Sequence, residues 1–255
     1  SLGTKYRKED LLPDTRKAKL GFIGAGWWAT SNHMPELSKR TDVEMAAVCR
    51  LGADELQKIK KEFNFHYATE DYTELLAIGD LDGVVVASPH TLHYEHALAA
   101  LRKGLHVMCE KPLCTTASDA RILVSEAQSR GLHLIVPHGW HFTPFIQEAK
   151  KRMDEGAVGE VEYILCHMAS PIRELLKGEC FEYEMDSMFM PPEPSTWADP
   201  KIAGGGYGLA QISHSASMAF WLTGLIPSTV HAFTSAPGSR VELYDAMSVK
   251  FACGA

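Results

Sequence analysis

Two short stretches of the chain carry residues whose types and spacing could do chemistry together. The first, Leu20–Ala29, has the pattern of a buried strand, a glycine turn and the start of a helix. In such a unit Gly24 allows a tight turn and Gly26 lets the backbone approach phosphates, while the helix start presents free N–H groups to an anion. A glycine turn also joins ordinary strands and helices, so it needs support from the rest of the chain. We expect a dinucleotide to bind at Gly24, Gly26, Trp27 and Trp28.

The second stretch is an apolar segment, Leu105–Cys109, followed directly by Glu110, Lys111 and Pro112. A single lysine is usually a solvated surface residue. Most solvated lysines, however, do not follow a buried strand and precede a proline, and ligands of open parallel sheets bind outside the carboxyl ends of the strands. We therefore expect Lys111 to act at that edge, with Glu110 beside a bound cofactor.

The elements that must position these residues alternate along the chain as strand and helix. An apolar strand is expected at Val43–Cys49, and a second apolar run begins at Gly83 and breaks at Ser88 and Pro89. With the last strand at Leu132–Val136, the pattern predicts six β units in a doubly wound parallel sheet, formed by residues 18–137. The rule on strand ends then places Ser88, Pro89 and His93 beside the cofactor.

The end of the second strand bears on which dinucleotide binds. An acidic residue there usually bonds the ribose hydroxyls of NAD, whereas an arginine accommodates the 2′-phosphate of NADP. This chain has Arg50 at that position. We expect NADP or NAD as cofactor, with Arg50 favouring NADP; a solvated arginine in a loop is the alternative.

His90, His93 and His96 are spaced so that they could share one helix face as metal ligands. No carboxylate or thiol completes the set at a ligand spacing, and surface or capping histidines are the commoner outcome. No metal site is expected, although His93 alone could bond the cofactor.

Composition limits the classes of partner. The 255-residue chain has a formal net charge of −7 and no sustained basic stripe, which argues against nucleic acid and anionic membranes and leaves a small-molecule substrate. No apolar run approaches the ~18 residues of a membrane span, and the charged start lacks a signal-peptide core, so a cytoplasmic protein is expected. The six cysteines are dispersed, which favours free thiols.

The periodicity changes after residue 137, which indicates a second domain at 138–255. We expect a helix at Pro144–Glu155, a strand with one buried face at Glu160–His167, and a proline-rich loop at 171–203 that covers a site. A helix at Leu209–Leu222 and strands near Thr229–Thr234 and Val241–Phe251 follow. Residues 1–17 are polar and aperiodic and suggest an arm.

Three motifs carry a resemblance to a known family: Gly24-Ala25-Gly26, the segment Ser88–His93, and Cys109–Leu113 with its Glu-Lys-Pro signature. With these motifs the chain resembles the Gfo/Idh/MocA oxidoreductases, named for glucose-fructose oxidoreductase and inositol dehydrogenase, from about Ala18 to its last residue. The resemblance implies an α/β fold: a Rossmann domain followed by an α+β domain with an open, mostly antiparallel sheet, through which the chain would form a homo-oligomer. The sequence stops in what looks like the middle of that sheet, so we expect this domain to be incomplete.

The resemblance also implies a catalytic histidine in the helix after a glycine motif, with a tryptophan seven residues later. His214 and Trp221 match this spacing. Two positions where the family often has acids hold Ala210, with Gln211 beside it, and Ser217, which puts a standard proton relay in doubt. Lys111 and His214 would handle the proton. Residues that could line the substrate side, each with ordinary packing as the alternative, are His138, Trp140, His141, Trp197, Tyr207 and Gln211.

The leading functional prediction is hydride transfer between the nicotinamide and a hydroxyl carbon of a sugar-, cyclitol- or polyol-like substrate. A second interpretation is a glycosidase or lyase of the same family, in which the cofactor is reduced and reoxidised within one cycle. A third is a non-catalytic dinucleotide-binding protein, which Ala210 and Ser217 motivate.

Overall fold

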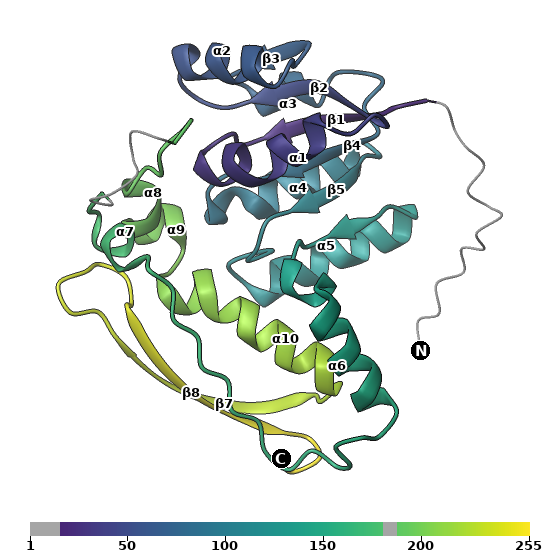
Figure 1. Cartoon of the computed structure of the whole chain (residues 1–255). Helices are drawn as coiled ribbons and strands as arrows, with labels where there is room; N and C mark the ends of the chain where they lie inside the picture. Colours follow the sequence, from purple (N-terminus) through teal and green to yellow (C-terminus); the bar gives the residue numbers. More distant parts are fainter. Residues whose placement is uncertain (1–15, 181–187) are drawn as a thin grey trace.

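The computed structural model of the protein describes residues 16–180 and 188–255 (Figure 1). Its first part is a parallel sheet with strand order β3-β2-β1-β4-β5-β6. This order reverses beside β1, which is where doubly wound sheets bind their ligands. The strands are β1 Ala18–Ile23, β2 Val43–Cys49, β3 Tyr67–Thr69, β4 Gly83–Val86, β5 His106–Cys109 and β6 Leu134–Ile135.

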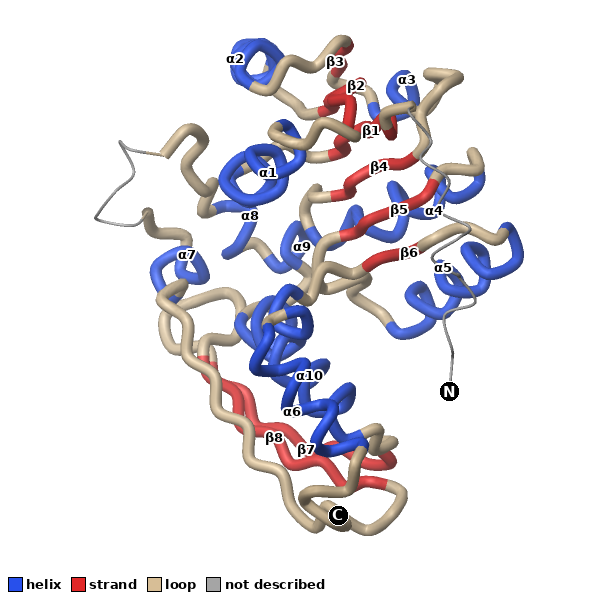
Figure 2. The backbone as a smooth tube through the Cα atoms, turned by 45° about the vertical axis from the view of Figure 1, so that its right-hand side comes forward, coloured by secondary structure: helices blue, strands red, loops and turns tan. Residues whose placement is uncertain are grey.

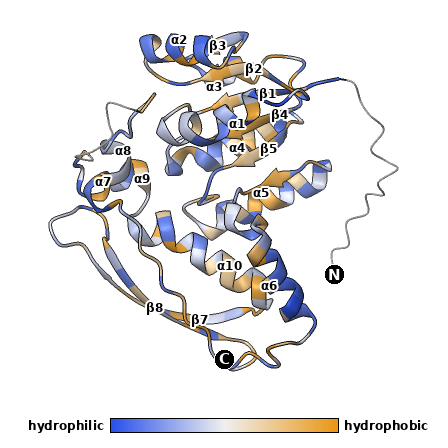
Figure 3. Cartoon of the chain, viewed as in Figure 1, coloured by the Kyte–Doolittle hydropathy of each residue, from blue (hydrophilic) through white to orange (hydrophobic). Residues whose placement is uncertain are grey.

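Helices cover both faces of this sheet (Figure 2). On one face, α4 and α5 pack with Val84 and Val86 of β4; on the other, α1 and α2 pack with Val85. Successive strand side chains point to opposite faces, so a fully apolar strand can be buried on both sides. Figure 3 shows this as hydrophobic strands lying between helices of mixed character. The helices of this part are η2 Ala29–His33, α1 Met34–Ser38, α2 Ala53–Glu62, α3 Tyr72–Leu75, η3 His90–Leu92, α4 His93–Arg102 and α5 Ala117–Arg130. The predicted doubly wound sheet is confirmed.

Local signals fix the ends of several helices. The side chain of Asp71 accepts a hydrogen bond from the backbone N–H of Thr73 and so caps α3. Gly131 ends α5 with a φ of 65°, a conformation that glycine adopts without strain.

The second part joins helices to an antiparallel hairpin of β7 Pro227–Ser235 and β8 Tyr244–Phe251. In Figures 1 and 2, α10 and α6 lie between this hairpin and the parallel sheet. This agrees with the expected α+β domain, although the antiparallel sheet contains two strands. The helices here are η4 Gly139–Phe142, α6 Pro144–Asp154, α7 Arg173–Lys177, α8 Ser195–Ala198, α9 Pro200–Ala203, η6 Gly208–Ile212 and α10 Ser213–Thr223.

The strand predicted at Glu160–His167 is wrong. These residues form no strand ladder with any described part of the chain. Alternation of apolar and polar residues favours an extended backbone, but a strand also needs a neighbour that supplies hydrogen bonds. The last strand also begins later than expected, because Val241 and Leu243 pack with Ile172 and Leu176 in a small core of their own.

Two expectations concern segments that are described only in part. The proline-rich loop at 171–203 contains α7, α8 and α9, and its residues 181–187 lie outside the described part of the chain. Most of the predicted arm, residues 1–15, also lies outside it, while Arg16 pairs with Asp82 at 2.8 Å. Within the described residues, no helix is long and apolar enough to cross a membrane.

Candidate functional site

The glycine turn has the geometry that a dinucleotide requires. Gly24 has a φ of 92°, and a Cβ on it would lie 2.3 Å from the backbone nitrogen of Ser88. A side chain there would therefore collide with the end of β4. Around Gly26, by contrast, a Cβ would have no atom within 4 Å, and the N–H of Thr30 bonds the Gly26 carbonyl at 3.1 Å as the helix begins. The turn thus leaves open space at a helix N-terminus, which suits a pyrophosphate.

Arg50 lies against this turn. It follows β2 directly, and its Nη1 donates a hydrogen bond to the carbonyl of Ala25 at 3.3 Å. Its Nε donates to the carbonyl of Leu51 at 2.9 Å. The guanidinium is therefore held next to the expected phosphate position, where the remaining N–H groups can reach an anion.

The residues after β4 have a supporting role. His93 is fully buried, and its ring nitrogens contact the carbonyl oxygens of Ser88 and Pro112, both at 2.8 Å. Burial lowers the pKa of His93, while these two contacts raise it. The ring joins the end of β4 to the turn that carries Lys111. His93 has no exposed surface, and its predicted contact with the cofactor stays a prediction.

His90 and His96 bond different parts of the chain, so the rings of His90, His93 and His96 do not meet at one point. His96 bonds the hydroxyl of Ser88 at 2.9 Å, and His90 bonds the carbonyl of Ala203 at 3.1 Å. Trp197 of α8 lies 6.1 Å from the ring of His90 and 6.3 Å from that of Trp27. Trp197 therefore lies beside Trp27, at the start of the helix that follows the glycine turn.

Lys111 lies at the carboxyl end of β5 and is only 7% exposed. Its Nζ donates a hydrogen bond to the carbonyl of Ala210 at 3.0 Å and lies 5.8 Å from the centre of the Trp28 ring. Burial lowers the pKa of this lysine, and the nearby Glu110 carboxylate opposes that shift. A lysine in this setting gives up its proton more readily than a solvated one.

Glu110 connects the glycine-turn helix to the lysine. Its Oε1 accepts a hydrogen bond from Nε1 of Trp28 at 2.9 Å and contacts Nε2 of His33 at 2.6 Å, and its Oε2 accepts from the backbone N–H of Lys111 at 3.0 Å. Burial raises the pKa of Glu110, but His33 and Lys111 outweigh it, so the net shift is downward. The sequence prediction missed His33, because no local signal pairs residues 77 positions apart.

Facing Lys111 is a group of histidines and tryptophans. The His214 ring stacks on Trp140 at 5.3 Å and lies 5.8 Å from the ring of His138. Burial, and then the charge of Lys111, lower the pKa of His214 to about 4. His214 is therefore neutral at physiological pH, which suits a relay better than a resting base. Nearby, the buried Nδ1 of His138 has no hydrogen-bond partner among the described residues.

Ser217 fills one position where the sequence lacks an expected acid. Its hydroxyl bonds Nε2 of His141 at 3.1 Å, and the His141 ring stacks on Trp221 at 5.0 Å. At the other such position, Ala210 contributes its backbone carbonyl, which accepts from Lys111. Neutral groups thus occupy both positions where the family often has acids.

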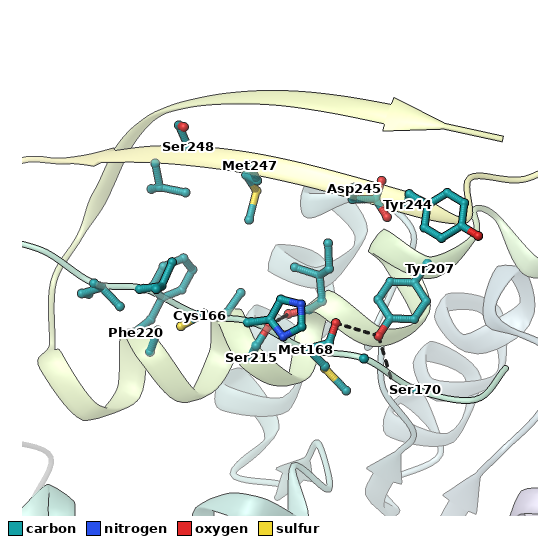
Figure 4. Close-up of a pocket in the computed structure, with 18 of the residues that line it drawn as sticks. Cys166, Met168, Ser170, Tyr207, Ser215, Phe220, Tyr244, Asp245, Met247 and Ser248 are labelled. Atoms are coloured by element: carbon teal, nitrogen blue, oxygen red, sulfur yellow. Dashed lines mark hydrogen bonds between the residues drawn. The ribbon is translucent and has the colours of Figure 1, made fainter. Parts of the chain in front are cut away.

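Gln211 and Tyr207 face elsewhere. Gln211 Oε1 accepts from the hydroxyl of Ser170 at 3.3 Å. The Tyr207 hydroxyl donates to the carbonyl of Met168 at 3.1 Å (Figure 4). Tyr207 lines a cavity of about 650 Å³ between residues 163–170, α10 and β8. Helical periodicity puts Ala216 and Ala219, which line this cavity, on a different side of α10 from His214. This cavity is not lined by His138, His141, His214 or the glycine turn, so we take the edge at Lys111 as the candidate site.

Known proteins resemble the chain over both parts. Residues 18–138 match the model of the GFO_IDH_MocA oxidoreductase family with its NAD-binding Rossmann fold, and residues 146–255 match the GFO/IDH/MocA C-terminal domain. The D-glucoside 3-dehydrogenase of Escherichia coli (strain K12) is 32% identical over 143 residues, which cover 56% of this chain and 41% of that protein. The scyllo-inositol 2-dehydrogenase (NADP(+)) of Bacillus subtilis (strain 168) is 28% identical over 153 residues, which cover 60% of this chain and 46% of that protein.

Among solved structures, the aldose-aldose oxidoreductase from Caulobacter crescentus complexed with glycerol is 25% identical with a TM-score of 0.74. That match covers 94% of this chain and 69% of the other. The matched part of the chain spans less than half the length of the two curated relatives above. Matches over both domains, with the glycine turn and Glu-Lys-Pro sequence in the expected places, lead to one conclusion: this chain belongs to the Gfo/Idh/MocA family of oxidoreductases.

Proposed function

We propose that the protein is an NAD(P)-dependent oxidoreductase that moves a hydride between the nicotinamide and a hydroxyl carbon of a sugar-, cyclitol- or polyol-like substrate. One observation carries this proposal. The buried Nζ of Lys111 is held at the strand edge beside the glycine turn, with His214 facing it. The similar relatives named for acting on a glucoside and on scyllo-inositol support the substrate class.

A bound nicotinamide supplies the hydride acceptor for an alcohol substrate. The protein must then remove the hydroxyl proton as the hydride leaves the carbon. Lys111, whose pKa burial lowers, accepts that proton in its neutral form. Neutral His214 bonds the hydroxyl or passes the proton onward, with Trp140 holding its ring.

For the cofactor, we propose that Gly24 and Gly26 receive the pyrophosphate and that Trp27, Trp28, Ser88, Pro89 and Glu110 line the nicotinamide side. Arg50 beside Ala25 favours NADP over NAD, because a guanidinium bonds a 2′-phosphate in a charge-assisted pair. His93 acts by supporting the Lys111 turn.

For the substrate, we propose binding at His138, whose ring lies 5.8 Å from that of His214, and at His141, whose ring lies 5.5 Å from that of His138. Trp197 and Gln211 belong to the outer boundary, since their contacts are to Trp27 and Ser170. Residues 18–137 hold the cofactor and residues 138–255 cover the substrate. We also propose that the chain forms a homo-oligomer through the β7–β8 sheet.

The deciding experiment mixes the purified protein with either dinucleotide and a panel of sugars, cyclitols, polyols and glycosides. Accumulation of reduced nicotinamide supports the oxidoreductase. Product without net reduction would instead indicate the glycosidase or lyase with internal redox cycling. Dinucleotide binding without turnover of any panel member would indicate a binding protein.

A further inference from the structure

Basic side chains crowd the candidate site. Lys111, His138, His141 and His214 lie close together, with ring distances of 5.5 Å between His138 and His141 and 5.8 Å between His138 and His214. A second lysine, Lys150 of α6, lies 5.9 Å from the centre of the Trp221 ring. Each histidine of this cluster has a lowered pKa, first through burial.

The carboxylates at this place are already engaged. Both oxygens of Glu110 hold protein donors, namely Trp28, His33 and the N–H of Lys111. Asp154 pairs with Lys150. Glu110 is the one acid that contributes to the pKa values of His138 and His214 within the described residues. Two further histidines interact with Lys111, and both bond backbone carbonyls: His90 that of Ala203, and His93 those of Ser88 and Pro112.

His138 has unused bonding capacity. Its Nδ1 is buried and finds no hydrogen-bond partner among the described residues, whereas His141 bonds Ser217. Buried polar atoms are nearly always bonded in folded proteins, so an unbonded one at a site points to a ligand. A group that accepts a hydrogen bond would satisfy Nδ1, and a negative charge on that group would be attracted by the Lys111 ammonium, which acts on His138.

We propose that the substrate is a polyhydroxy acid, an aldonate or uronate, whose carboxylate binds at His138 with His141 behind it while the hydroxyl to be oxidised faces Lys111 and His214. This proposal rests on the oxidoreductase function and narrows its substrate class. It also requires a protonation change. His138 is neutral without ligand, because burial and the neighbouring bases lower its pKa, and a carboxylate beside it raises that pKa. Binding of the acid therefore takes up a proton, and its affinity falls as the pH rises.

The test compares aldonates and uronates of several hexoses, each with its own neutral amide. Binding to the full chain with dinucleotide present is measured by calorimetry, in buffers that differ in ionisation enthalpy so that proton uptake is counted. We expect at least one acid to bind about tenfold or more tightly than its amide, with uptake of a proton only for the acid. The variant His138→Asn should bring the acid-to-amide ratio close to one, and His66→Asn, at an exposed histidine outside the site, should leave it unchanged.

Each outcome bears on the proposal. Equal binding of acids and amides, no binding of any acid, or an unchanged preference in His138→Asn would overturn it. If the variant His138→Asn no longer binds the dinucleotide, it is not used for the comparison. The proton uptake measured when the unmodified protein binds the acid then decides whether the carboxylate binds at a histidine. Tight binding of an acid that never reduces the cofactor would support this inference and refute the oxidoreductase function. If the neutral compounds are turned over faster and acids bind no more tightly than their amides, the oxidoreductase function is supported and the acid substrate is refuted.

Discussion

The ammonium nitrogen of Lys111 lies in a buried position and donates a hydrogen bond to the backbone carbonyl of Ala210, and this setting defines its expected chemistry. In the variant Lys111→Met the proton acceptor is lost while the shape of the side chain is largely kept. We expect kcat to fall about 100-fold or more, with the dinucleotide Kd nearly unchanged. Lys111→Arg serves as a matched control and should not restore activity, because arginine stays protonated. Unchanged turnover in Lys111→Met would refute the assignment.

The pH dependence of the reaction follows from the same residue. Burial lowers the pKa of Lys111, so its neutral fraction increases as the pH rises through that lowered value. Only the neutral form accepts a proton, so kcat for alcohol oxidation should rise with pH and then level off below the ordinary range of lysine. The pH profile of kcat measures this directly. A rate that falls with rising pH would exclude a neutral lysine base.

Arg50 determines the expected cofactor preference at the residue scale. Replacing it in Arg50→Asp removes the guanidinium beside Ala25 and adds a carboxylate that repels a 2′-phosphate. The affinity for NADP should fall by about tenfold or more relative to NAD, as measured by fluorescence titration of both cofactors. Equal affinities for the two cofactors, in both the unmodified protein and the variant, would show that Arg50 has no part in the choice.

At the scale of elements, the helix after the glycine turn is tied to the end of β5 through His33 and Glu110. The variant His33→Leu leaves a buried carboxylate with one partner fewer, which should lower the free energy of unfolding by about 1–3 kcal/mol. We expect kcat to fall further than this loss of stability explains, because Glu110 also holds Trp28 against Lys111.

Chemical denaturation and steady-state kinetics on His33→Leu and His33→Gln separate these effects. The glutamine can still donate to Glu110, so it should recover part of both losses. His66→Leu, at an exposed histidine, provides the control. If His33→Leu loses stability but keeps its kcat, the pair is structural only.

At the scale of the whole molecule, the β7–β8 hairpin exposes apolar side chains. Phe233 is 82% exposed, and it pairs across the hairpin with Ala246, so both side chains point to the same face. If this sheet joins two copies, Phe233→Lys should shift the molecular mass in solution toward the monomer, as measured by analytical ultracentrifugation. Leu51→Lys, which changes a residue 77% exposed near the parallel sheet, should leave the mass unchanged. A monomer before any substitution would refute the proposed oligomer.

The sequence by itself determined the parallel sheet and its functional edge. Strands such as β4 are apolar throughout because both of their faces are buried, and that pattern is local. The glycine turn, Arg50 and Lys111 could be located for the same reason, since each directly follows a strand whose end defines the edge of the sheet.

The tertiary structure decided which side chains meet. His33 reaches Glu110 across 77 positions, His93 is enclosed rather than open, and Gln211 faces Ser170 instead of Lys111. It also decided that Glu160–His167 has no strand partner within the described chain. These features depend on contacts between distant segments, and residue type and periodicity report only which face of an element is buried.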